Sequence, residues 1–174
     1  RTQEGNNPIL IGIGVNTGKM MLGTLGESDR MEGSVISDAV NLAARLEGLT
    51  KLYKTPLLLS EETLLKIGNS IFDTRLIDKV AVKGKENPVM VYEVLSGESS
   101  DLRDAKISTL PKFKKGFELY QNQQFENALE LFRKCTEKVH EDGVAELYIE
   151  RCQKLLSSGW DTETWDGINY MDVK

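Results

Sequence analysis

The chain has 174 residues, of which 40% are hydrophobic and 28% charged, with a formal net charge of −5 at pH 7. These values fit one ordinary domain or two small ones with a packed core. The negative charge argues against a nucleic-acid partner, because phosphate backbones are bound by cationic surfaces. No apolar run approaches the roughly 20 residues of a membrane-spanning helix, and no secretory signal opens the sequence, so we expect a cytoplasmic location.

The first elements predicted are two strands. Residues 9–15 have apolar side chains on one face and Gly12 and Gly14 on the other, which predicts a buried strand with another element packed closely against it. After a turn at residues 16–18, residues 19–24 predict a second strand, antiparallel to the first. Residues 26–33 are polar and predict a loop.

A helix follows, because Ser37 is a good N-cap, Asp38 suits the positive end of a helix, and apolar residues then recur every three or four positions. The next elements are a strand at 56–59, a helix capped by Ser60, and strands at 72–82 and 89–95. The predicted order is β-β-α-β-α-β-β, which is an α+β fold.

The C-terminal half has a different pattern. Residues 96–108 are rich in serine, glycine and aspartate and predict a linker, whereas residues 109–158 have helical periodicity and predict three helices. Four aromatic residues are expected to form a core completed by the third helix, by the first segment or by a second subunit: Phe113, Phe117, Phe125 and Phe132. The tail, residues 159–174, carries Trp160 and Trp165 and is expected to dock or to be partly disordered.

Metal-ligating side chains are sparse. Cys135 and Cys152 lie in predicted helices without metal-ligand spacing, so we expect reduced thiols. The single histidine, His140, is expected at the surface. We predict no metal ligand in this chain.

The densest polar pattern lies on the first predicted helix. Asp38, Asn41 and Arg45 are spaced at i, i+3 and i+7 and line one polar stripe, while Leu42 and Leu46 face another side. An amide hydrogen-bonds sugar oxygens, and a guanidinium offers a planar fork for phosphate, as phosphoryl transfer requires. On spacing alone, a solvated surface helix is the more common explanation.

Three collinear blocks resemble the class III adenylate and guanylate cyclases. They are GIGVNTGKMMLGTLG, DRMEGSVISDAVNLAARLEGLTKLYKTPLLLSEET and VAVKGKENPVMVYEV, and they cover roughly residues 8–95. The resemblance implies that residues 1–95 are the C-terminal portion of a ferredoxin-like catalytic domain, followed by a small all-α segment. The implied reaction converts ATP to cyclic AMP and pyrophosphate.

Residue roles follow from the same resemblance. Asn41 and Arg45 are implied to orient the ribose and stabilise the transition state, and Ser34 to select the base. The predicted substrate-binding residues also include Asp38 and the VKGK block, where the resemblance implies a phosphate-approaching lysine that is Lys83 or Lys85, with Lys83 favoured. Serine at position 34 is compatible with adenine, so guanylate cyclase is an alternative.

The family's two metal-binding aspartates lie on earlier strands, and no such block precedes residue 9. Because Arg1 is not a start methionine, we expect the chain to be part of a longer protein. Anchoring of that longer protein to a membrane by upstream segments is an alternative to a purely cytoplasmic location. The ligands of Mg²⁺ or Mn²⁺ are then expected upstream, and this piece alone is expected to be inactive. The family's head-to-tail arrangement implies a homodimer, with the nucleotide shared between subunits. The alternative is a degenerate cyclase that serves only dimerisation or docking.

Residues 109–158 resemble one tetratricopeptide repeat, because Gly116, Ala128 and Phe132 have its small, small and aromatic spacing. Such repeats stack, and roughly three are needed for independent stability. We therefore expect these helices to be completed by other parts of the protein. A groove that binds a protein partner is the functional alternative.

Overall fold

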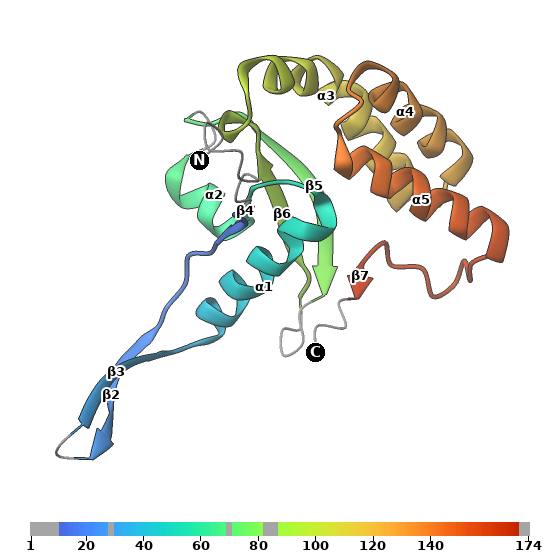
Figure 1. Ribbon diagram of the computed structural model, residues 1–174. Helices are drawn as coiled ribbons and strands as arrows, with labels where there is room; N and C mark the ends of the chain where they lie inside the picture. The colour runs from blue at the N-terminus through green and yellow to red at the C-terminus, as the bar shows by residue number, and fades with distance from the viewer. Residues whose placement is uncertain (1–10, 28–29, 69–70, 82–86, 171–174) are drawn as a thin grey trace, which may run out of the picture.

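The computed structural model describes residues 11–27, 30–68, 71–81 and 87–170, arranged as a mixed α+β structure (Figure 1). A five-stranded sheet has the order β1-β4-β6-β5-β7, with parallel pairs at its two edges and antiparallel pairs between them. Its strands are β1 (Ile13–Val15), β4 (Leu57–Ser60), β5 (Thr74–Ala81), β6 (Val89–Val94) and β7 (Asn169–Tyr170). A separate hairpin consists of β2 (Met21–Glu27) and β3 (Arg30–Ile36). The helices are α1 (Asp38–Tyr53), α2 (Glu61–Ile67), α3 (Ser100–Gln121), α4 (Phe125–Lys138) and α5 (Gly143–Ser158), with a short 3₁₀ turn η2 at Leu95–Gly97.

The close packing predicted at the two glycines of the first strand is confirmed. A Cβ atom on Gly14 would lie 2.2 Å from the backbone nitrogen of Glu47 and 2.4 Å from the carbonyl oxygen of Ala43, both in α1. One on Gly12 would lie 2.0 Å from the Thr50 hydroxyl oxygen. Helix α1 therefore lies directly on β1, with no room for side chains between them.

The prediction for residues 19–33 is wrong in two respects. β1 pairs in parallel with β4, whereas β2 pairs with β3, whose seven residues include much of the predicted loop. The chain does not fold back after β1, because the Asn16 side chain donates to the Ala39 carbonyl (3.0 Å) and accepts from Ser60 (2.6 Å). Figure 1 shows the hairpin extending away from the other elements, where a strand needs no apolar face.

The predicted linker at residues 96–108 is also wrong. Apart from the turn η2, most of it belongs to α3, which begins at Ser100 and continues through Pro111. Its composition suggested a loop, but Lys106 and Thr109 are buried, and the Lys106 ammonium binds Glu93 (2.6 Å) and Glu98 (2.8 Å). Tertiary contacts thus override weak local helix preference.

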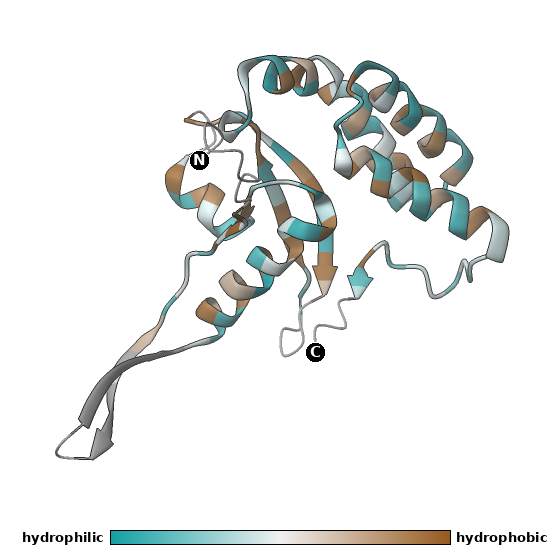
Figure 2. Cartoon of the chain, in the orientation of Figure 1, coloured by the Kyte–Doolittle hydropathy of each residue, from teal (hydrophilic) through white to brown (hydrophobic). Residues whose placement is uncertain are grey.

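The aromatic core predicted for the C-terminal helices is confirmed. Phe113, Phe125 and Phe132 are fully buried, and Phe117 is 7% exposed. Tyr148 of the third helix completes the core by stacking on Phe132 at 4.8 Å between ring centroids. Helices α3–α5 carry both hydrophilic and hydrophobic segments in Figure 2, as amphipathic helices do. Leu42 and Leu46 of α1 belong to the same buried cluster, so the sheet and the helices share one core.

Buried ion pairs join the sheet to the helices. Arg75 of β5 is 1% exposed, pairs with Glu93 of β6 (2.5 Å) and Asp142 at the start of α5 (2.7 Å), and stacks over the Phe113 ring at 4.1 Å. Asp142 also caps α5 by accepting from the Ala145 backbone nitrogen at 3.2 Å. Each charge therefore has a partner of opposite sign, which buried charges require.

The described part of the tail is docked on the helices, which confirms the first of the two expectations for it. The Trp165 indole donates to the Gln121 carbonyl (3.2 Å) and its ring lies 5.0 Å from that of Phe125. Asn169–Tyr170 of this segment form β7, which pairs with β5. The two cysteines are free and buried, and His140 is exposed, as predicted. Across the described parts of the chain, no helix combines the length and apolar character needed to cross a bilayer.

Candidate functional site

Helix α1 begins as the sequence predicts. Ser37 has an extended backbone (φ −168°, ψ 157°), and its hydroxyl accepts from the Val40 backbone nitrogen at 3.3 Å. Asp38 lies in the first turn, where its charge complements the helix dipole. Because β3 ends at Ile36 and α1 begins at Asp38, Ser37 is the single residue between the hairpin and the helix.

The two sides of α1 separate as expected from the spacing. Leu42 and Leu46 are 2% and 0% exposed. Asn41 and Asp38 are exposed, and Arg45 is half-buried. One turn of helix separates Asn41 from Arg45, so the amide and the guanidinium are neighbours along one edge of the helix.

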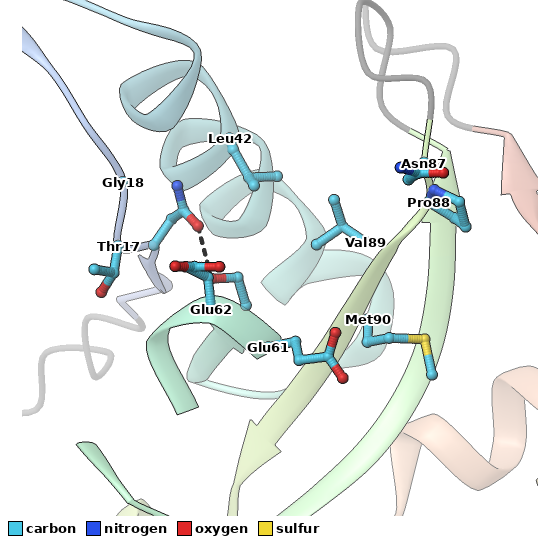
Figure 3. A pocket seen from close by; sticks show the side chains of 11 residues that line it. Thr17, Gly18, Leu42, Glu61, Glu62, Asn87, Pro88, Val89 and Met90 are labelled. Carbon is cyan, nitrogen blue, oxygen red and sulfur yellow. Dashed lines mark hydrogen bonds between the residues drawn. The ribbon is translucent and has the colours of Figure 1, made fainter. Parts of the chain in front are cut away.

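A hollow of about 560 Å³ opens beside the N-terminal half of α1 (Figure 3). Its walls come from four segments that lie far apart in the sequence: residues 16–18, Leu42, residues 60–62 and residues 87–90. Asn41 and Arg45 are not among its lining residues, although Leu42 is. The structure therefore brings the predicted pair to the helix surface next to this hollow rather than into it.

The hollow has an acidic and partly apolar lining. Glu61 and Glu62 approach from α2, and Leu42 and Val89 contribute apolar walls (Figure 3). No lysine or arginine is among its described lining residues. Among the described residues, the lining itself therefore offers an anion no cationic side chain, whereas the guanidinium of Arg45 lies outside the hollow on the same helix as Leu42.

Sequence reasoning missed the polar contacts that organise this region. Ser60 caps α2 as predicted by accepting from the Thr63 backbone nitrogen (3.3 Å), and its hydroxyl also donates to Asn16. The Thr63 hydroxyl in turn donates to the Thr17 hydroxyl at 3.2 Å. The sequence signals are Asn16 and Thr17 directly after a strand, a pattern that by itself predicts only a turn.

The remaining predicted residues are less informative. Ser34 lies on β3, where its backbone pairs with Gly23 of β2. Lys83 and Lys85 lie outside the described residues. Among the described residues, no group of three or more His, Cys, Asp or Glu side chains is arranged to hold a metal ion.

Known proteins resemble this chain most clearly over its first half. A family model described as the adenylate and guanylate cyclase catalytic domain matches residues 1–96. The "Adenylate cyclase, terminal-differentiation specific" of Dictyostelium discoideum is 44% identical over 143 residues, which are 81% of this chain and 7% of that protein. An adenylate cyclase of Anabaena cylindrica is 44% identical over 88 residues, 49% of this chain and 18% of that protein. The crystal structure of the adenylyl cyclase CyaB from P. aeruginosa is 35% identical, covers 47% of this chain and 40% of its own, and has a TM-score of 0.39.

The chain spans only a small part of these curated relatives, at 7% and 18% of their lengths. The 143 residues matched in the Dictyostelium protein exceed the 96 of the family model, so that likeness extends into the C-terminal helices. The family model itself covers more than half of the 174 residues. The chain therefore belongs to the adenylate and guanylate cyclase catalytic-domain family.

Proposed function

We propose that this chain is part of an adenylate cyclase that converts ATP to cyclic AMP and pyrophosphate. Asn41 and Arg45 are the groups it contributes to the transition state. The observation that carries the proposal is an amide and a guanidinium one turn apart on α1, with Asn41 exposed and Arg45 half-buried. Both relatives reported above are named adenylate cyclases, which favours ATP over GTP.

In the reaction, the 3′-oxygen of the ribose bonds to the α-phosphorus, the bond to pyrophosphate breaks, and the hydroxyl proton is lost. Negative charge shifts toward the phosphoryl oxygens and the leaving group. A permanently charged guanidinium stabilises that charge, and an amide fixes the ribose so that the attacking oxygen is in line. We assign the first role to Arg45 and the second to Asn41.

The nucleotide reaches these side chains from a neighbouring subunit in this proposal. Support comes from their position at the surface of α1, outside the hollow that the chain forms alone. A helix edge that offers a cation and an amide to a second molecule is suited to a site shared across a homodimer. The base is then selected by residues that include Ser34, with Asp38, Lys83 and Lys85 near the substrate.

The family uses Mg²⁺ or Mn²⁺, but the described residues do not fit such an ion, since they form no cluster of three or more metal-ligating side chains. In this proposal the metal ligands come from another part of the complete protein, so the 174-residue chain alone makes no cyclic AMP with either ion.

The test uses the complete protein and measures cyclic AMP formation from ATP. Arg45→Ala is expected to lower kcat by about 100-fold or more, because a charge-stabilising donor is lost. Asn41→Ala is expected to lower kcat with a smaller change in KM for ATP. Arg133→Ala removes an exposed arginine from α4 and serves as the matched control, with wild-type turnover expected. Unchanged turnover in Arg45→Ala would contradict the proposal.

Substrate choice is tested in the same assay by replacing ATP with GTP. A higher kcat/KM for GTP would favour the guanylate cyclase alternative, and turnover of neither nucleotide would favour a docking module.

We also propose that residues 109–158 are tetratricopeptide-like. The fit of Gly116, where a Cβ atom would lie 3.2 Å from the Phe132 ring, supports this.

A further inference from the structure

We infer that the C-terminal helices hold α1 in its working position through the buried carboxylate of Asp78. Tyr53 and Arg151 are then positioning residues for Asn41 and Arg45. The inference rests on the function proposed above and extends it to Asp78 and Arg151, which lie outside the cyclase blocks. It gives the helical segment a role in the reaction in place of a separate binding role.

Asp78 is the shared acceptor of three segments. Its side chain is 0% exposed and accepts hydrogen bonds from the Tyr53 hydroxyl at the end of α1, from Arg151 of α5 (2.7 Å) and from Asn169 of β7 (2.7 and 2.8 Å). A register shift in β5 between Leu76 and Asp78 interrupts the strand's alternation just before this residue. Such irregularities redirect side chains.

The protonation states suit this arrangement. Burial, and then the negative charge of Asp78, raise the pKa of Tyr53 well above its ordinary value, so its hydroxyl remains a donor at neutral pH. Arg151 lies over the rings of Tyr148 and Tyr53 at 5.0 and 5.8 Å, which fixes its guanidinium beside the carboxylate. The charge of Asp78 is thus balanced by a cation that the C-terminal segment supplies.

A second contact joins the same two helices. Lys54, the residue after α1, pairs with Glu146 of α5 at 2.8 Å. The start of α5 approaches so closely that a Cβ atom on Gly143 would lie 2.6 Å from the Lys54 Cβ. The C-terminal end of α1 is therefore held by α5 both in the core and at the surface.

Because α1 is a rigid helix, a small tilt at its anchored C-terminal end displaces Asn41 and Arg45. Asn41 lies 12 residues before Tyr53, which is about 18 Å along a rigid helix. A tilt of about 5° at the Tyr53 end would move Asn41 by about 1.5 Å. Displacements of about 1 Å from the reacting geometry cost up to 100-fold in rate. Small losses of restraint at Asp78 are thus amplified at the reacting end.

The experiment compares variants of the complete protein. Tyr53→Phe keeps the ring and removes the donor to Asp78, and Arg151→Met keeps an apolar stem and removes the cation. Both are expected to lower kcat by about tenfold with KM for ATP within about twofold, as lost transition-state alignment predicts. Arg151→Lys keeps a cation and is expected to retain more kcat than Arg151→Met.

The matched control is Tyr148→Phe. It also removes a buried tyrosine hydroxyl, but that hydroxyl donates to the Ile77 carbonyl of β5 at 2.7 Å rather than to the Asp78 carboxylate. A lower Tm with wild-type kcat is expected. Hydrogen exchange gives a readout independent of turnover: amides of residues 42–53 should exchange faster in Tyr53→Phe than in Tyr148→Phe.

The outcomes separate this inference from the proposed function. If Arg45→Ala loses turnover while Tyr53→Phe and Arg151→Met keep wild-type kcat and lose only thermal stability, the positioning role is wrong and the cyclase proposal stands. Equal exchange of residues 42–53 in Tyr53→Phe and Tyr148→Phe would also overturn the positioning role. Wild-type turnover in Arg45→Ala removes the proposed function and this inference together.

Discussion

Arg75 shows how much a single residue contributes to joining the two halves of the chain. Transferring a guanidinium from water into a protein interior costs several kcal/mol, which only well-placed partners offset. Arg75 has two carboxylates, one on its own sheet (Glu93) and one at the start of α5 (Asp142). Removing either carboxylate leaves a buried cation only partly compensated.

We expect Asp142→Asn to destabilise the protein by about 3 kcal/mol at pH 7, the scale on which broken buried ion pairs are measured. Asparagine keeps the shape and a capping oxygen for α5, so the loss reports mainly the missing charge. Urea unfolding of both proteins measures the difference. Glu130→Gln is the control, because Glu130 pairs with Lys134 at an exposed site where its loss is nearly neutral. A loss in Asp142→Asn no larger than in the control would contradict the prediction.

The pH dependence of that difference has a definite sign. Burial opposes ionisation of Asp142, but the hydrogen bonds and charge of Arg75 outweigh it and hold the pKa of Asp142 below its ordinary value. A lowered pKa in the folded state adds stability above the unfolded pKa, about 3.9, and loses it as the pH falls through the folded pKa. The free-energy difference between wild type and Asp142→Asn should therefore be constant above about pH 5 and narrow below about pH 4. A difference in unfolding free energy between the two proteins that increases as the pH falls would contradict this prediction.

Among the elements, α1 depends on glycine in the strand β1 beneath it, because a side chain there would collide with the helix. Gly14→Ala places a methyl group within 2.2 Å of α1 backbone atoms, which cannot move aside as a side chain tip can. Gly48 lies on the exposed side of the same helix, where a Cβ would meet no atom within 4 Å beyond the adjoining backbone of its own helix. The same substitution thus meets opposite conditions on the two sides of α1.

We expect Gly14→Ala to cost about 3 kcal/mol, at the upper end of overpacking effects, because the whole helix must shift. Gly48→Ala should instead stabilise by up to about 1 kcal/mol, because alanine is a better helix former. Chemical denaturation of both variants provides the comparison. Equal effects, or a stable Gly14→Ala, would mean that α1 does not lie on β1 as described.

The elements also show where sequence reasoning works and where it fails. Helices α1 and α2 and strands β4–β6 could be predicted, because capping residues and apolar periodicity act locally. The second half of α3 was predicted from its periodicity, but the first half was not, because Lys106 there is held by Glu93 and Glu98, partners that lie outside α3. The polar stripe of Asn41 and Arg45 follows from spacing within one helix. The adjoining hollow joins four distant segments and has no local signal.

At the scale of the whole molecule, α1, the central strands of the sheet and the C-terminal helices share one hydrophobic core. Phe113 lies under Arg75 of the sheet, and Tyr148 binds the backbone of β5. Separating the two halves would expose the buried charges of Arg75, Asp78 and Glu93 to water without their helical partners. Units that share a core and its ion pairs unfold together, unlike domains joined by a linker.

We therefore expect the chain to unfold in one transition. Trp160 and Trp165 report on the C-terminal segment through fluorescence, and amide exchange of residues 42–53 reports on α1. Both should give the same unfolding free energy, because Arg151 and Asp142 tie the segments together. Trypsin should cleave after Arg103 or Lys106 only as fast as the whole chain unfolds, since both residues lie within α3. Cleavage at these sites faster than global unfolding would contradict this prediction. So would a tryptophan fluorescence transition at a lower urea concentration than the loss of amide protection in α1. Either result would mean that the C-terminal helices unfold as a separate unit and that α1 does not depend on them.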